Sequence, residues 1–259
     1  MEMAARQISE KESLIAGLYA DDSQKTDGAQ IVILGPPGGG KTWAAIVGAP
    51  DPALIDLEGG AKRYGHLNKE LKRIDGAALD WPQLMAVLDV VSTSKHQTVI
   101  IDTADAAAEM LRQHLIQAFD IDLIKDSFHQ GGRGYGHTTD VLTDYWRKFI
   151  GKLSKMTASG KHAIVICHVD EKEVLKPGMR PVQKQEPRLP RKIAPLLTEW
   201  AELVGHLQLE ESGDELESKL VRNFYISPDL HVSAKNRFAI DKQYLVNTNI
   251  GEILNIIYQ

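Results

Sequence analysis

Short apolar runs alternate along the chain with longer segments whose apolar residues recur at helical spacing. The runs have the length of buried strands and lie at 31–34, 53–60, 98–103 and 163–168. Segments with helical spacing follow them at 43–47, 80–91, 104–119 and 139–156. This alternation predicts an α/β fold with a mainly parallel central sheet flanked by helices.

The pattern changes in the last third of the chain. Strands are predicted at 202–209 and 219–226, followed by a short final helix that begins at Asn249. We therefore expect antiparallel strands toward the C-terminus of a single core over residues 29–259. Residues 1–28 should form a separate N-terminal helix, with apolar positions between 7 and 20, and a polar linker.

The first apolar run leads into a glycine-rich loop of the pattern G-x-x-x-x-G-K-[ST]. Glycines let successive backbone N–H groups turn toward one bound phosphate, and a helix should begin directly after them. We expect Lys41 to reach the β- and γ-phosphates and Thr42 to bind Mg²⁺. The predicted nucleotide-binding residues are Gly35, Pro36, Pro37, Gly38, Gly39, Gly40, Lys41, Thr42 and Trp43.

Three polar side chains follow the later apolar runs. Asp102 ends the third run and matches the Walker B pattern, in which a carboxylate holds the Mg²⁺ shell. Glu58 ends the second run and could orient a water for attack on a γ-phosphate, or could only cap the next turn. His168 ends the fourth run and either senses the γ-phosphate or is hydrogen-bonded in the sheet edge. All three should face the phosphate loop, because ligands sit at the carboxyl edge of such sheets.

Composition limits the binding partners and the cellular compartment that we expect for this protein. The net charge of −5 over 259 residues excludes a uniformly basic nucleic-acid-binding surface, so any such contact needs a local basic patch. The single cysteine, Cys167, excludes a disulfide framework and favours a reducing compartment. No apolar run reaches transmembrane length and the N-terminus has no signal-peptide core. We therefore expect a cytoplasmic protein with no membrane partner.

Two segments break the α/β pattern and could supply a basic patch. The first, residues 131–137, places Arg133 and Tyr135 among glycines, a combination that binds single-stranded nucleic acid or forms an ordinary surface loop. The second, residues 170–192, carries seven basic and four acidic residues, and its prolines argue against regular secondary structure. It is either a phosphate-backbone contact or a solvated surface excursion. Its candidate DNA-binding residues are Lys172, Lys176, Arg180, Lys184 and Arg188.

A last cluster, Lys235-Asn236-Arg237-Phe238, presents two cations that would point the same way on a strand. Together with the phosphate loop, Glu58, Asp102 and His168, it makes residues 29–240 resemble the RecA/RadA-like ATPases, and most closely their compact phage-type members. This resemblance implies a RecA-like P-loop core that binds ATP and Mg²⁺ between subunits of a ring or filament. It also implies that Glu58 is the catalytic base and that Lys235 and Arg237 reach the neighbour's ATP.

The resemblance further implies a single-stranded-DNA-binding ATPase for phage homologous recombination or single-strand annealing, acting in a bacterial host cell with a possible single-strand DNA-binding protein as partner. The two unusual segments fall where the family has its DNA loops. A helicase or translocase motor, and an assembly in which ATP is bound without hydrolysis, fit the same residues. A small-molecule kinase is the remaining alternative, for which the sequence shows no acceptor pocket.

Overall fold

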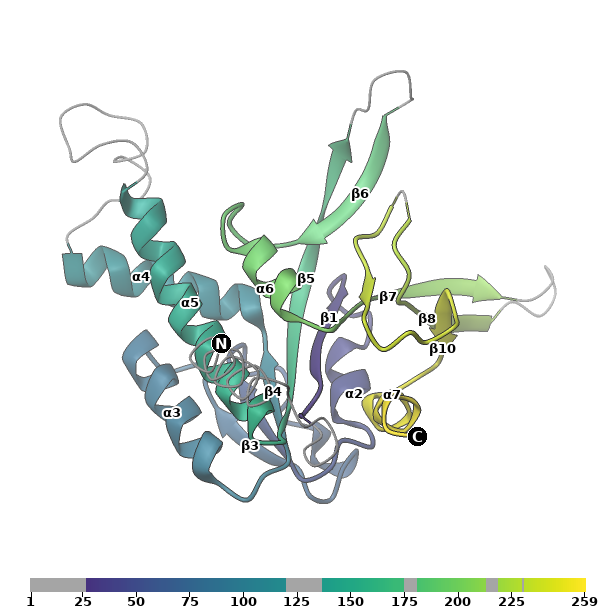
Figure 1. Cartoon of the computed structure of the whole chain (residues 1–259), viewed down its shortest axis with the longest axis horizontal. Helices are drawn as coiled ribbons and strands as arrows, with labels where there is room; N and C mark the ends of the chain where they lie inside the picture. The colour runs from purple at the N-terminus through teal and green to yellow at the C-terminus, as the bar shows by residue number, and fades with distance from the viewer. Residues whose placement is uncertain (1–26, 120–136, 175–180, 213–218, 230) are drawn as a thin grey trace, which may run out of the picture.

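The computed structural model describes residues 27–119, 137–174, 181–212, 219–229 and 231–259 (Figure 1). The predicted N-terminal helix and most of its linker lie outside these ranges, as do Arg133, Tyr135, Lys176 and Arg180. Within them the predicted α/β fold is confirmed: a mostly parallel sheet is flanked by helices, and antiparallel strands follow toward the C-terminus.

The centre of the sheet is a set of parallel strands in the order β7-β1-β5-β4-β2-β3. Their bounds are Leu203–Ser212, Gln30–Gly35, His162–Val174, Thr98–Asp102, Pro52–Asp56 and Lys72–Asp75. The apolar residues of β1, β2, β4 and the first half of β5 are buried, because helices cover both faces of the sheet. This double burial explains why these strands read as continuous apolar runs.

Helices divide between the two faces. On one face lie α3 (Trp81–Thr93), α4 (Ala104–Phe119), α5 (His137–Ala158) and α6 (Ala194–Trp200), which share a core with alternate residues of the sheet. On the other lie α2 (Lys41–Ile46) and α7 (Ile250–Ile257). A short 3₁₀ helix, Tyr64–His66, follows β2. No helix in the described ranges is long and apolar enough to cross a membrane.

Local signals in the sequence explain where two of these helices begin. Asp80 accepts the backbone N–H of Gln83, whose side chain accepts the backbone N–H of Asp80, so a reciprocal capping box starts α3. Asn249 caps α7 by accepting the backbone N–H of Glu252 at 3.2 Å. Both starts agree with the sequence-based prediction.

Antiparallel strands extend the sheet beyond β7. β8 (Lys219–Tyr225) pairs with β7, β10 (Tyr244–Val246) pairs with β8, and the two-residue β9 (Lys235–Asn236) pairs with β7 at Leu203 and Val204. The phenyl ring of Phe224 on β8 lies directly over Gly205 of β7. β8 is thereby held against the parallel core, close to the first strand and its loop.

The segment 170–192 differs from the prediction that its prolines forbid regular structure. β5 continues to Val174 and pairs antiparallel with β6 (Val182–Pro187), which forms a hairpin that projects from the core (Figure 1). The prediction was wrong because Pro181 precedes β6 and Pro187 is its last residue. Neither proline therefore occupies the interior of the strand, where a missing N–H would interrupt the pairing.

Candidate active site

The carboxyl ends of the parallel strands meet at one edge of the sheet, as the sequence predicted. Gly35 at the end of β1 is the register partner of His168 on β5. Asp102 at the end of β4 is opposite Asp56 at the end of β2. The three predicted polar residues Glu58, Asp102 and His168 therefore reach the same region as the glycine-rich loop that follows β1.

A cleft of about 520 Å³ opens at this edge. Six of the nine predicted nucleotide-binding residues line it: Pro37, Gly38, Gly40, Lys41, Thr42 and Trp43. The other three, Gly35, Pro36 and Gly39, form the turn beside it, in which the backbone N–H of Gly39 donates to the carbonyl of Pro36 at 3.2 Å. Glu58, Asp102 and His168 also line the cleft.

Lys41 is held inside the loop. Its side chain is buried, and Nζ donates a hydrogen bond to the carbonyl oxygen of Pro36 at 2.8 Å. Burial lowers the pKa of the Lys41 ammonium, and the negative charges of Asp102, Asp105 and Glu58 oppose that shift. The loop therefore places a desolvated cation where phosphate oxygens could replace a backbone carbonyl as its partner.

Thr42 and Asp102 form an oxygen-rich pair next to Lys41. Thr42 Oγ1 donates a hydrogen bond to Asp102 Oδ2 at 2.8 Å. Burial raises the pKa of Asp102 to about 6, although the Thr42 hydroxyl opposes the shift. A hydroxyl and a carboxylate are the oxygen ligands that Mg²⁺ takes from a protein beside substrate phosphates, so this donor set fits Mg²⁺.

Two carboxylates follow β2, and the structure gives them different positions. Asp56 is completely buried and accepts hydrogen bonds from Arg73 at 2.8 Å and from the backbone N–H groups of Gly60 and Ala61. It therefore caps the turn and holds β3. Glu58 instead lines the cleft with its side chain 42% exposed, and its Oε1 accepts the hydroxyl hydrogen of Thr103 at 3.0 Å.

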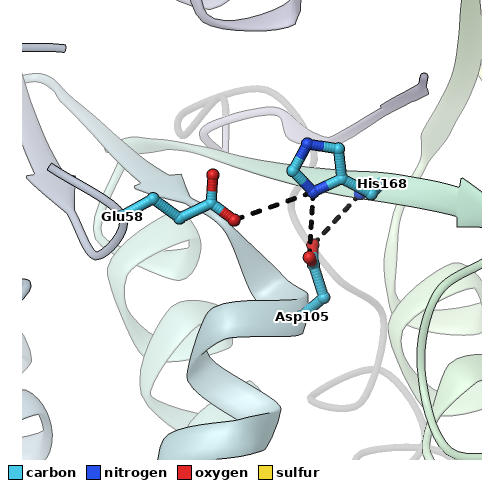
Figure 2. Close-up of side chains that lie close together, drawn as sticks. All are labelled: Glu58, Asp105 and His168. Atoms are coloured by element: carbon cyan, nitrogen blue, oxygen red, sulfur yellow. Dashed lines mark hydrogen bonds and ion pairs between the residues drawn. The ribbon is translucent and has the colours of Figure 1, made fainter. Parts of the chain in front are cut away.

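His168 and Asp105 form a bonded pair beside Glu58 (Figure 2). Nδ1 of His168 lies 2.9 Å from Asp105 Oδ2 and 3.7 Å from Glu58 Oε1. Asp105 is partly buried, which favours its neutral form, but the bonds from His168 prevail and lower its pKa. Ligand atoms of the three residues lie within 4.8 Å of one another, a spacing that these mutual contacts explain.

Comparison with known proteins agrees with this geometry. The model of the AAA domain family AAA_24 matches residues 27–238, which include the whole cleft. The chain belongs to this family. Membership establishes a P-loop domain of the nucleotide-binding AAA class. No curated protein sequence matches the chain.

Solved structures with a similar fold include two archaeal proteins. A KaiC-like protein from Pyrococcus horikoshii aligns over 77% of this AAA domain chain and 79% of its own chain, with a TM-score of 0.45 and 16% identity. The flagellar accessory protein FlaH from Methanocaldococcus jannaschii aligns over 87% of this chain and 88% of its own, with a TM-score of 0.39 and 13% identity.

The AAA domain cleft also contains residues that sequence reasoning missed. Tyr64 and His66 belong to the 3₁₀ helix after β2, and Leu67 directly follows it. Arg222 comes from β8, far along the chain. The aromatic Tyr64 could have been noticed because it follows Glu58 by six residues. No sequence signal identified Arg222, because strand alternation does not say which distant loop a side chain faces.

The two cations predicted to act in trans lie outside the cleft of their own AAA domain. Lys235 Nζ donates to the backbone carbonyls of Thr198 at 3.2 Å and Glu199 at 2.7 Å, near the end of α6. Arg237 is exposed and lies just after the two-residue β9, so the two cations do not share a strand as expected. Neither residue is among those that line the cleft.

Two of the predicted DNA-binding residues are on the strands of the β5–β6 hairpin, and a third, Arg188, directly follows β6. Lys172 and Lys184 are register partners on the two strands. Lys172 also forms an ion pair with Glu186 at 2.9 Å, and Arg188 forms one with Asp170 at 2.7 Å. The carboxylates of Glu186 and Asp170 therefore neutralise part of the positive charge that the sequence assigned to this segment.

Proposed function

We propose that this AAA domain protein hydrolyses ATP with Mg²⁺, and that it acts on single-stranded DNA in phage homologous recombination or single-strand annealing. One observation carries the first half of the proposal. A single cleft contains the phosphate loop with Lys41, the Thr42–Asp102 pair and the exposed carboxylate of Glu58. These are a phosphate cradle, a metal-ligand pair and a candidate general base.

Glu58 suits the role of base because it is fixed without being buried. The Thr103 hydroxyl holds one carboxylate oxygen, while the side chain remains accessible from the cleft. A water between Glu58 and the γ-phosphate would lose its proton to this carboxylate as it attacks phosphorus. Lys41 would neutralise charge on the transferring group, and bound Mg²⁺ would add a second positive charge there.

Lys235 and Arg237 support a homo-oligomeric site. They lie away from their own cleft, so they can contact ATP only in a neighbouring subunit. A cation delivered from another subunit can stabilise the charge of the transition state as an arginine finger does. We propose that two copies of the chain share each ATP, in a ring or a filament.

Two lysines on the β5–β6 hairpin support a contact with DNA. Lys172 and Lys184 lie directly opposite each other on neighbouring strands, so their like charges repel, and the ion pair of Lys172 with Glu186 offsets this repulsion only in part. A DNA phosphate would offset the rest, and His168, in the middle of β5 just before the hairpin begins, connects the hairpin with the cleft. The proposal therefore places ATP beside the middle of β5 and DNA toward its C-terminal end.

The first test measures ATP hydrolysis by the wild type and Lys41→Ala, with and without Mg²⁺ and a single-stranded oligonucleotide. The matched control is Lys155→Ala, which removes an exposed lysine of α5. We expect Mg²⁺-dependent turnover in the wild type and the control and its loss in Lys41→Ala. The absence of both ATP binding and hydrolysis in the wild type would reject the proposed enzyme.

The second test measures binding of a single-stranded oligonucleotide as a function of salt. In Lys172→Ala/Lys184→Ala we expect weaker binding. The slope of log Kd against the logarithm of the salt concentration should fall by about two, about one for each lost phosphate contact. Lys219→Ala, at the exposed start of β8, should bind as the wild type does. Annealing of complementary strands without unwinding of a forked duplex supports the annealing role, whereas directional unwinding would favour a motor.

A further inference from the structure

Arg222 lines the cleft, and the proposed mechanism gives it no role. It belongs to β8, which comes from the antiparallel part of the sheet, and its position there is fixed from both sides. Its backbone N–H donates to Asn247 Oδ1 at 2.9 Å, and its carbonyl accepts the N–H of Asn247 at 2.7 Å. The side chain therefore extends from a firmly held backbone.

The side chain of Arg222 lies against the phosphate loop. A methyl group in place of the Gly40 hydrogen would be 2.7 Å from Arg222 Nε. The guanidinium carbon is 5.3 Å from the centroid of the Trp43 ring, at cation–π distance. Gly40 and Trp43 flank the Lys41-Thr42 pair, so Arg222 covers the loop next to its binding lysine.

No residue in the described part of the chain forms an ion pair with Arg222. Nε of Arg222 is buried and has no hydrogen-bond acceptor among these residues. A buried donor without an acceptor costs free energy. Because this guanidinium also lines the cleft, the site favours an incoming anion beside it, and the phosphates of a nucleotide are the anions for which the adjoining loop is built.

We infer that Arg222 is a nucleotide-binding residue that contacts the α- and β-phosphates within its own subunit. The inference rests on the proposed function, since it concerns the same ATP. Position decides which phosphates are involved: the loop backbone cradles the α- and β-phosphates, whereas Lys41 reaches toward the γ-phosphate. The base is a poorer partner, because the guanidinium is already at cation–π distance from the Trp43 ring and its N–H groups bond most strongly to anions.

This role separates Arg222 from the cations proposed to act in trans. Lys235 and Arg237 would contact the group that is transferred, so their loss should affect turnover of ATP. Arg222 would contact phosphates that ATP and ADP share. Loss of Arg222 should weaken the binding of both nucleotides by the same factor. This effect should not depend on oligomer formation.

The test is equilibrium binding of Mg-ATP, Mg-ADP and Mg-tripolyphosphate to the wild type, Arg222→Ala and Arg222→Lys. Arg147→Ala is the matched control, because Arg147 is an exposed arginine of α5 that forms an ion pair with Asp144. Thermal unfolding checks that each variant is folded, and Arg222→Lys keeps the charge if Arg222→Ala fails to fold. We expect Arg222→Ala to weaken all three ligands by about 10- to 100-fold, from the strength of a hydrogen bond to a charged group.

The affinities of Arg222→Lys should lie between those of the wild type and Arg222→Ala, because lysine keeps the positive charge but lacks the planar set of guanidinium donors. Affinities of Arg222→Ala within twofold of the wild type would overturn the inference. Weaker binding of ATP together with unchanged binding of tripolyphosphate would also overturn the inference, because Arg222 would then contact the nucleoside. In both cases the wild type still binds ATP, so the proposed function survives; failure of the wild type to bind any of the three ligands would instead reject the proposed function.

Discussion

Asp105 holds His168 by two hydrogen bonds: its Oδ2 lies 2.9 Å from His168 Nδ1, and its Oδ1 accepts the backbone N–H of His168 at 3.1 Å. Asp105 is on α4 and does not line the cleft, whereas His168 does. The carboxylate fixes the ring so that Nδ1 carries its hydrogen toward Asp105 and Nε2 remains for other partners. Asp105 therefore orients His168 from a position outside the cleft.

We expect Asp105→Asn to lower kcat for ATP by about tenfold and to leave KM within about twofold, because the ring orientation changes while the phosphate loop does not. Steady-state kinetics over a range of ATP concentrations measures both constants. Asp144→Asn on the exposed face of α5 is the control. If His168→Ala and the double variant with Asp105→Asn differ in kcat, the two residues act independently and this account of Asp105 is wrong.

The Thr42–Asp102 pair predicts a specific dependence on metal. Asp102→Asn keeps an oxygen that can accept the Thr42 hydroxyl hydrogen but removes the negative charge that holds Mg²⁺. The Mg²⁺ concentration for half-maximal ATP hydrolysis should rise by at least about tenfold. Asp75→Asn, at the end of β3 and beside Arg73, offers a control at the same edge of the sheet. Equal Mg²⁺ requirements in Asp102→Asn and the wild type would exclude Asp102 as the metal-holding residue.

Gly205 should tolerate no larger side chain while Phe224 is present. A Cβ at position 205 would be 2.0 Å from Cζ of Phe224, inside the buried core between β7 and β8. Gly205→Ala should lower the free energy of unfolding by about 1–3 kcal/mol, measured by urea denaturation. Phe224→Leu should lower the free energy of unfolding by less in the Gly205→Ala background than in the wild type. Additive costs for the two changes would show that the ring does not lie over Gly205.

His206 on β7 predicts loss of stability at mildly acidic pH. The ring is completely buried; Nε2 donates to the carbonyl of Ser233 at 3.2 Å, and burial lowers the pKa of the ring from 6.5 to about 4. Between these two pKa values the unfolded chain binds a proton at this ring and the folded chain does not. The free energy of unfolding therefore falls as the pH drops from about 6.5 to about 4. The full loss from this residue is about 3 kcal/mol.

The measurement is the free energy of unfolding against pH for the wild type and His206→Gln. Glutamine can still donate to Ser233 but does not titrate, so its curve should be flatter over that interval. Burial also lowers the pKa of His162, which contributes in the same direction to both proteins and cancels in the comparison. Parallel curves would show that His206 does not titrate on unfolding.

The core of the fold could be read from the sequence because its signals are local. Strands β1, β2, β4 and the start of β5 are buried on both faces, so their apolar runs are unmistakable, and the polar residues that end them must share one edge. The phosphate loop is recognisable within a few residues. This is why Lys41, Glu58, Asp102 and His168 could be placed near one another in advance.

Other features depend on contacts that a linear pattern does not contain. β3 reads Lys-Arg-Ile-Asp and lies at the sheet edge, where a polar sequence forms a strand because β2 is beside it. The β5–β6 hairpin was missed because prolines at strand ends look the same in sequence as prolines in strand interiors. Arg222 meets the phosphate loop only because the β7–β8 pairing brings β8 back across the core.

The most direct test of the central claim compares ATP binding and turnover in the wild type and Glu58→Gln. Glutamine can still accept the Thr103 hydroxyl hydrogen, so the cleft keeps its shape and loses only the base. Single-turnover hydrolysis of Mg-ATP should slow by about 100-fold or more, while the Kd for Mg-ATP stays within about twofold. Hydrolysis at the wild-type rate in Glu58→Gln would contradict the assignment of this cleft as an ATPase site with Glu58 as its base.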